Sequence, residues 1–396
     1  MIKKKLIIFI SLFFASCTTN QTQKDLRLDG DFYTIDLDGK KEPSIRLSSI
    51  FKNVRTIFLE TNEACLMGDI YDFQVFDGYM YILDYKSAKS LFVFDMEGKF
   101  IRKIGGIGGG PGEYKEAGAF TLDTENRIIY LRDRNIVHKY KFDGTFLHSF
   151  TIPAEGNVHF IHFYNGRLYS DCVWWRPSKD DVLLLEIDPN DGKIISQSVS
   201  VKYNKGWNKG FYSGSNNFFK SRMNNPPRYN AMFMDYIVSL GKEVKPYIEL
   251  KSKNRITEKD VESFTEDKGM LNVNNILRKS RYVNSFIEND DLIYFKCGMM
   301  PFSTSVILYK KSGEVKLANY SNNDLIFKQD ETGMLEQFVF SDSKGAYVIY
   351  NTQSLAFGEY QRYLNKNDAV PNLNNLDQLM ELTFDSNPVI FFYEYK

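Results

Sequence analysis

Glycine-marked turns recur along this chain at a nearly constant interval, and this recurrence constrains the fold more than any other feature. Each turn glycine follows a β-branched or aromatic run, and another strand-like run begins soon after it. These glycines are Gly98, Gly144, Gly192, Gly241 and Gly313, and the first three intervals are 46, 48 and 49 residues. Glycine supplies the positive φ that tight hairpin turns need. A multi-strand repeat of about 40–50 residues is typical of a β-propeller.

The fourth interval, from Gly241 to Gly313, is longer at 72 residues. The excess lies in residues 257–280, TEKDVESFTEDKGMLNVNNILRKS, which have helical spacing with Thr257 as a candidate N-cap. Removing an insertion of about two dozen residues restores the period of the repeat. We therefore predict short helical insertions in an otherwise regular array.

The two ends of the chain supply a sixth blade. Residues 337–340 and 346–350 read as its opening hairpin, and the terminal NPVIFFYEYK reads as its third strand. The missing outer strand is available in VRTIFLET, residues 54–61. Joining the first and last segments in one sheet would close the ring, which otherwise would leave two unpaired edges. The sequence predicts an all-β, six-bladed β-propeller whose N- and C-terminal strands close the last blade.

The N-terminus predicts export and lipidation. In MIKKKLIIFISLFFASC, three lysines precede an apolar run, and Ala15 and Ser16 precede Cys17. This order describes a signal peptide, and small residues before a cysteine resemble the bacterial lipobox, although Phe14 stands where leucine is preferred. An ordinary signal peptide with an incidental cysteine is the alternative. We predict a lipoprotein signal peptide over residues 1–16, acylation of Cys17, a flexible tether over 17–30 and the propeller over 31–396.

The composition argues against nucleic acid as a partner and against a framework of several disulfides. The 50 Lys and Arg residues balance the 50 Asp and Glu residues, so the chain lacks the positive field that nucleic-acid binding uses. Cys65, Cys172 and Cys297 match no metal-binding spacing. We expect buried free thiols, or one disulfide and one thiol.

Two segments carry a family resemblance. FDMEGKFIRKIGGIGGGPGEY and the terminal DSNPVIFFYEYK resemble the six-bladed β-propeller lipoproteins of Gram-negative bacteria, which are NHL/TolB-like propellers. The resemblance implies a propeller at the outer membrane, facing the periplasm or the cell surface. It implies no catalytic residues.

The glycine-rich stretch IGGIGGGPGEY, residues 104–114, resembles a phosphate-binding loop only superficially. Pro111 stands where a dinucleotide loop needs its last glycine, and no Gly-Lys-Ser/Thr ending is present. The residues that follow read as a strand, so no helix N-terminus is offered to a phosphate. We predict the crossing between the outer strand of one blade and the inner strand of the next.

Few side chains suggest catalysis. His159 and His162 are expected on opposite faces of a strand. Asp69, Glu113 and Glu336 fall near the starts of inner strands, where a calcium or other metal ion could lie in a central channel. Solvated or backbone-capping acids are the favoured reading of all three. A propeller hydrolase, lactonase or lyase with a channel metal is thus the alternative to a non-enzymatic protein without a cofactor.

A binding surface is better supported than a catalytic centre. CVWWRPSKDD places Trp174, Trp175 and Arg176 between a strand and a polar turn. Flat amphipathic rings on loops suit sugar or peptide recognition, although aromatic residues also fill the gaps between blades. We predict a lipid-anchored binding or scaffolding module whose partner is a glycan, a peptide or another envelope protein.

Overall fold

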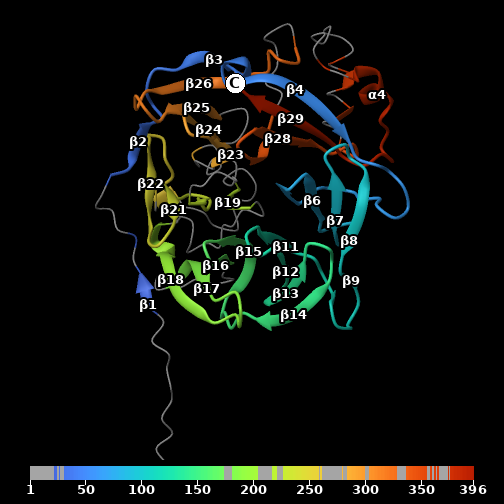
Figure 1. Cartoon of the computed structure of the whole chain (residues 1–396). Coiled ribbons are helices and arrows are strands. Elements are labelled where there is room, and N and C mark those ends of the chain that lie inside the picture. Colours follow the sequence, from blue (N-terminus) through green and yellow to red (C-terminus); the bar gives the residue numbers. More distant parts are fainter. Residues whose placement is uncertain are drawn as a thin grey trace, which may run out of the picture.

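The computed structural model describes most of the chain. The described residues are 22–24, 26, 31–173, 181–203, 216–220, 226–257, 259–260, 279, 283–298, 303–327, 336–354, 357–358, 361–362, 364, 373 and 375–396. They form a ring of six antiparallel sheets, and within each sheet the strands follow one another from the centre of the ring to its rim (Figure 1). The predicted six-bladed β-propeller is confirmed.

The blades are numbered along the chain, and their strands follow from inner to outer. Blade 1 holds β5 (Asp72–Phe76), β6 (Tyr79–Asp84), β7 (Ser90–Asp95) and β8 (Phe100–Ile104). Blade 2 holds β11 (Ala119–Asp123), β12 (Ile128–Asp133), β13 (Ile136–Lys141) and β14 (Phe146–Thr151). Blade 3 holds β15 (Asn157–Tyr164), β16 (Arg167–Val173), β17 (Val182–Ile187) and β18 (Ile194–Ser200). Blade 4 holds β19 (Phe218–Phe219), β20 (Arg228–Tyr229), β21 (Tyr236–Leu240) and β22 (Val244–Lys251). Blade 5 holds β23 (Val283–Glu288), β24 (Leu292–Cys297), β25 (Thr304–Tyr309) and β26 (Val315–Asn322). Blade 6 holds β27 (Phe338–Ser341), β28 (Gly345–Tyr350), β29 (Val389–Tyr395) and β4 (Phe51–Phe58).

The five turn glycines all join the third and fourth strands of a blade. Gly98, Gly144, Gly192 and Gly313 have positive φ angles of 86°, 91°, 80° and 71°. Gly241 occupies the same turn in blade 4 without a positive φ. The repeat in the sequence is therefore the repeat of one hairpin per blade.

Blade 6 lacks this hairpin because its outer strand comes from the other end of the chain. β29 pairs antiparallel with β4, from Val389 opposite Phe58 to Tyr393 opposite Val54. The buried side chain of Asn387 fastens the junction, since its amide donates to the carbonyls of Glu60 and Cys65. The predicted closure by the two ends is confirmed.

Three N-terminal strands run around the outside of the ring. β1 (Thr22–Lys24), β2 (Tyr33–Asp36) and β3 (Glu42–Arg46) each add a parallel strand to the outer edge of blade 3, 4 or 5. We call them the N-terminal strap. The strap covers edges that would otherwise be open to other chains, and it buries Ile35 and Ile45. β1 lies inside the segment predicted to be a tether.

The remaining short elements lie between blades or outside them. They are η1 (Leu47–Ser49), β9 (Gly106–Ile107), β10 (Glu113–Tyr114), η2 (Val201–Tyr203) and α4 (Leu376–Glu381). The Thr257 hydroxyl accepts a hydrogen bond from the Asp260 N–H, as an N-cap would, and most of the predicted insertion beyond it lies outside the described residues. Among the described helices, none has the length and apolar character needed to cross a membrane.

The glycine-rich stretch is the predicted crossing from β8 to β11. Glycine is needed there because the backbone passes close to aromatic rings. A Cβ at Gly105 would lie 2.7 Å from the Tyr140 hydroxyl, and one at Gly112 would lie 2.8 Å from Phe146. Glu113 accepts a hydrogen bond from the Gly110 N–H, so it caps this backbone.

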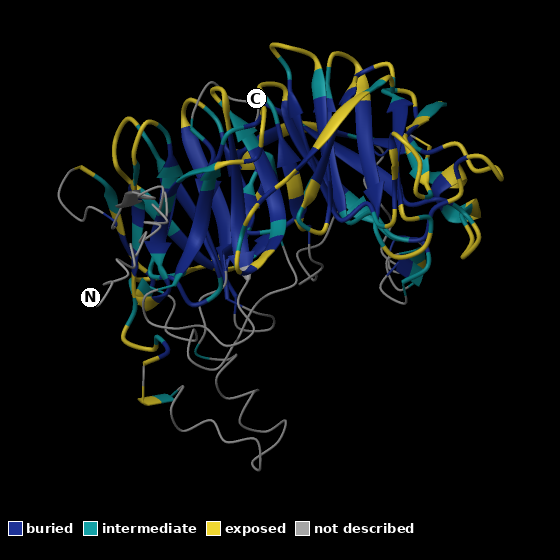
Figure 2. Cartoon of the chain, turned by 90° about the horizontal axis from the view of Figure 1, so that it is seen from below, coloured by how far each residue is buried: buried dark blue, intermediate teal, exposed yellow. Residues whose placement is uncertain are grey.

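The core lies between adjacent blades, where large side chains from facing sheets interlock. Figure 2 shows buried residues along the strands and exposed residues concentrated in the turns. Many of the interlocking residues are aromatic. Phe51, for example, packs against Phe338, Tyr393 and Tyr395 with ring centroids 5.3–5.4 Å apart. The aromatic residues, which make up 15% of the chain, therefore serve blade packing.

Candidate functional site at the centre of the ring

A pocket of about 410 Å³ lies where the inner strands begin. Residues at or near the starts of β5, β23 and β27 line it, together with Phe160 of β15 and residues of the β19 segment. We call it the central pocket. Because five of the six blades contribute, the pocket exists only in the closed ring. Figure 1 shows β19 lying toward the middle of the ring.

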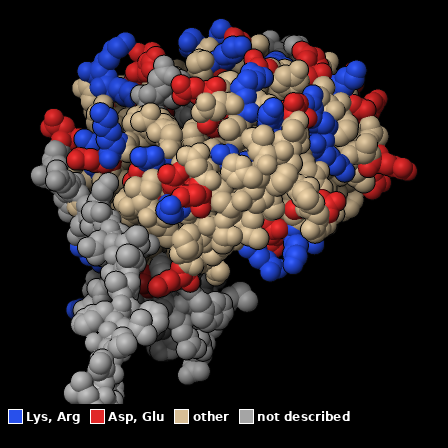
Figure 3. Space-filling model, turned by 60° about the horizontal axis from the view of Figure 1, so that its bottom comes forward, with Lys and Arg blue, Asp and Glu red and all other residues tan. Residues whose placement is uncertain are grey.

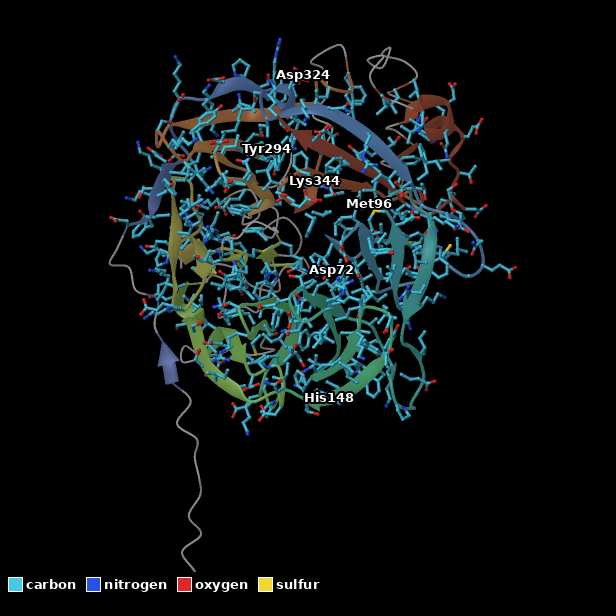
Figure 4. The ribbon with its side chains drawn as sticks, viewed as in Figure 1. Asp72, Met96, His148, Tyr294, Asp324 and Lys344 are labelled. Carbon is cyan, nitrogen blue, oxygen red and sulfur yellow. The ribbon has the colours of Figure 1, made fainter. Side chains whose placement is uncertain are left out.

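A buried ion pair crosses the central pocket. Lys220 follows β19 in blade 4, and its Nζ lies 2.6 and 2.5 Å from the two carboxylate oxygens of Asp72 in blade 1. The ammonium also donates to the Phe120 carbonyl of blade 2 at 3.3 Å. Both side chains are almost fully buried (3% and 4% exposed), and Figure 4 shows Asp72 on the inner side of the ring. Burial raises the pKa of Asp72, and the Lys220 ammonium opposes that rise.

Stacked aromatic rings form the walls of the central pocket. Tyr71 stacks on Phe160 with ring centroids 5.5 Å apart, and Phe219 stacks on Phe286 at 4.6 Å. The polar lining besides the ion pair is mostly uncharged and includes three carboxamides, those of Asn216, Asn284 and Gln337. This combination can hold a flat apolar face and hydrogen-bond to the polar groups around it.

A second group of polar side chains lies behind Phe160. The buried Asp171 carboxylate accepts hydrogen bonds from the Phe160 N–H at 2.5 Å and the Asn217 amide at 2.9 Å. The Nδ1 atom of His159 lies 3.9 Å from the same carboxylate. Burial raises the pKa of Asp171 and lowers that of His159.

Tyr71 stays protonated beside this group. Burial is the main reason that its pKa rises to about 12. The Tyr71 hydroxyl and the imidazole of His159, whose pKa is lowered, are therefore both neutral near pH 7. Tyr71 thus adds a neutral hydrogen-bonding group to the lining of the central pocket.

The three acids singled out in the sequence have three different settings. Asp69 lines the central pocket. Glu113 caps the glycine-rich crossing, as a backbone-capping acid was expected to do. Glu336 is fully buried, and one carboxylate oxygen accepts a hydrogen bond from the Asn323 amide while the other has no partner. The described part of the chain brings together no three His, Cys, Asp or Glu side chains able to hold a metal ion.

The remaining predicted residues divide between described and undescribed parts. Cys65, Cys172 and Cys297 are buried free thiols, the first of the two expectations. Cys17 and the run Trp174, Trp175 and Arg176 lie outside the described residues.

Sequence analysis missed the ion pair and Asp171. The signal was faint: Asp72, Asp171 and Lys220 are charged residues inside or directly beside strand-like apolar runs, where burial without a partner is unfavourable. Nothing in the sequence tells which residue each one meets.

The comparisons with known proteins agree with this architecture. A family model described as "Domain of unknown function (DUF4934)" matches residues 32–394. No curated protein matches the chain. A Bacteroides fragilis protein described as exported is similar in structure, with a TM-score of 0.68 and 17% identity over 92% of this chain and 100% of that one. A DUF4221 family member from Bacteroides vulgatus has a TM-score of 0.51 and 10% identity over 87% of this chain and 96% of that one. At such identities the likeness supports the propeller fold.

Proposed function

The chain belongs to the DUF4934 family, and from this premise we propose that it is a lipid-anchored propeller of the cell envelope that binds an uncharged ligand. The composition of the central pocket carries the proposal, because stacked rings and carboxamides surround an ion pair that neutralises itself. Lys220 already has its counterion, so an anionic ligand would find no free cation among the described lining residues, and Asp69 can accept hydrogen bonds from hydroxyl groups. A sugar ring fits this chemistry, since it has a flat apolar face and hydroxyl groups at its edge.

Envelope anchoring is the second part of the proposal. The signal sequence and the lipobox-like residues before Cys17 support acylation and placement at the outer membrane. Acyl chains contribute about 0.8 kcal/mol per buried methylene, so they hold a domain without a spanning helix. The similar B. fragilis protein is described as exported, which agrees with this address. A propeller that faces the periplasm and one that faces the cell surface are both consistent with an outer-membrane anchor.

We also propose that Trp174, Trp175 and Arg176 extend the binding surface. They follow Val173 directly at the end of β16, and Asp171 of the same strand holds Phe160 of the central pocket in place. A loop at this end of blade 3 can therefore reach a ligand in the pocket.

The test is a glycan and peptide array with the mature chain carrying Cys17→Ser, followed by calorimetry on any hit. We expect binding to a neutral glycan, or to an uncharged peptide as the other outcome. Phe286→Ala, which removes a pocket wall, should weaken it at least tenfold, by about 1.4 kcal/mol. Tyr79→Ala is the matched control, because Tyr79 is an exposed aromatic residue at the opposite end of β5–β6.

Two results would contradict the proposal. Binding that survives both Phe286→Ala and the pair Trp174→Ala and Trp175→Ala would exclude the central pocket as the site. Stoichiometric calcium or zinc in the purified protein, with hydrolase or lyase activity lost on chelation, would favour the metal-dependent enzyme instead.

A further inference from the structure

Two neighbouring outer strands carry no charged side chain. β14 reads FLHSFT and β18 reads IISQSVS. The other four outer strands, β4, β8, β22 and β26, each contain at least one Lys, Arg or Glu. We call β14 and β18 the uncharged rim; β1, which reads TQK and includes Lys24, pairs along the outside of β18. Figure 3 brings this side of the ring forward and shows a broad area without Lys, Arg, Asp or Glu.

The uncharged rim also exposes apolar side chains and an open strand edge. Leu147 on β14 is 39% exposed, and Ile136 on the neighbouring β13 is 40% exposed. β14 is the outermost strand of its sheet in the described chain, whereas the strap covers β18. His148 points outward at this rim in Figure 4.

The N-terminus leaves the propeller at the same rim. β1 pairs with β18, with Thr22 opposite Ser196 and Lys24 opposite Ser198. Leu26 is buried in the core of blade 3, and its carbonyl accepts a hydrogen bond from the Tyr203 hydroxyl. The attachment point of the chain is therefore fixed on the outside of blade 3 rather than above or below the ring.

The distance from this point to the lipid is short. Residues 18–21 alone separate Cys17 from Thr22, so a fully extended chain spans at most about 18 Å. An acylated Cys17 would hold the rim of blade 3 close to the bilayer. This argument rests on the lipid anchor proposed above.

From the uncharged rim and its attachment point we propose that the propeller stands edge-on, with β14 and the β1–β18 edge of blade 3 facing the membrane. A side chain brought near the low-dielectric bilayer loses hydration, which is costly for a charged group and cheap for an uncharged one. Leu147 and Ile136 can enter the headgroup layer and lower the free energy of contact. In this orientation the ring axis lies parallel to the membrane, and the central pocket opens sideways toward partners in the same membrane.

The test uses the acylated full chain on vesicles that contain nitroxide-labelled phospholipid. A thiol-reactive fluorophore is attached to His148→Cys on β14, or to Lys52→Cys on β4 across the ring as the control. The parent chain is the blank, because Cys65, Cys172 and Cys297 are buried. We expect the lipid to quench the label at position 148 several-fold more than the label at position 52.

The outcomes separate this inference from the lipid anchor. A chain that fails to float with vesicles would overturn the anchor. A chain that floats, but shows equal or reversed quenching at the two positions, would overturn the edge-on orientation alone. Shielding of position 148 from both lipid and a water-soluble quencher would mean that a second copy covers β14, which would also overturn it. Introducing charge with His148→Glu and Ser149→Glu should reduce the quenching of a label at Leu147→Cys. The circular dichroism spectrum should remain that of the folded protein.

Discussion

The ion pair between Lys220 and Asp72 puts two opposite charges in a nearly dry environment at the centre of the ring. Such a pair adds little net stability over apolar residues of similar volume, because both groups lose their hydration. Removing one partner is different, since the other charge stays buried alone. The contact between blades 1 and 4 therefore depends on both partners, because either one alone would be a buried charge without a counterion.

Lys220→Met should destabilise the fold by about 3–5 kcal/mol, because Asp72 is left without its counterion. The double variant Lys220→Met and Asp72→Leu should recover most of that loss. Urea denaturation of the two variants and the parent measures the difference. A double variant as unstable as the single one would show that the pair does not act as a unit.

Glu336 makes stability depend on pH in a direction that its burial determines. Desolvation raises the pKa of this carboxyl above its ordinary value of 4.5, so the folded protein holds the proton more tightly than the unfolded chain. The stabilising contribution is full below pH 4.5 and declines as the pH rises through the folded-state pKa. Glu336→Gln keeps the hydrogen-bonding shape without the charge, so its free energy of unfolding should decline less over this range. If the free energies of unfolding of the variant and the parent change in parallel with pH, this account is contradicted.

At the scale of the element, the turn between the third and fourth strands of a blade serves a second purpose. In blade 1 this turn meets the outer strand of the preceding blade, and the Glu60 N–H donates to the Gly98 carbonyl at 2.8 Å. A Cβ at Gly98 would lie 2.0 Å from the Phe58 carbonyl oxygen. In blade 3 a Cβ at Gly192 would meet the Thr151 carbonyl oxygen at 2.6 Å. The turn glycine there supplies close contact between blades as well as a positive φ.

Gly98→Ala and Gly313→Ala separate the need for a positive φ from the need for close contact between blades. Both glycines have positive φ, but a Cβ at Gly313 meets nothing within 4 Å. Gly313→Ala should cost about 1–2 kcal/mol from backbone strain alone. Gly98→Ala should cost clearly more, because β4 must shift. If both variants lose the same free energy of unfolding in denaturant titrations, the contact between blades contributes nothing.

The sequence predicted the elements whose signal is local. The turn glycines located five hairpins, and the predicted hairpin over residues 337–340 and 346–350 matches β27 and β28 to within one residue. The strap was not predicted, because β1 to β3 are short and pair in parallel with strands far along the chain, without a turn between them. The ion pair joins residues 148 positions apart, so its two halves could be seen but not matched.

At the scale of the whole molecule, one seam holds the ring closed. The seam is the pairing of β29 with β4, secured by Asn387, whose side chain also accepts a hydrogen bond from the Met67 N–H at 2.9 Å. The pocket and the seam depend on each other, because blade 6 contributes to both.

Asn387→Ala should lower the free energy of unfolding by about 3 kcal/mol, because buried backbone groups lose their partner. Asn190→Ala, at an exposed turn, is the control and should change it little. Chemical denaturation monitored by fluorescence checks both. A small effect of Asn387→Ala would indicate that strand pairing alone holds the seam.

The seam also sets the order of events during biosynthesis. Val54 leaves the ribosome 339 residues before its partner Tyr393. Until then β4 has no neighbour on that side, and long-range pairing of this kind forms slowly. A nascent chain thus cannot complete its circle until β29 has been made.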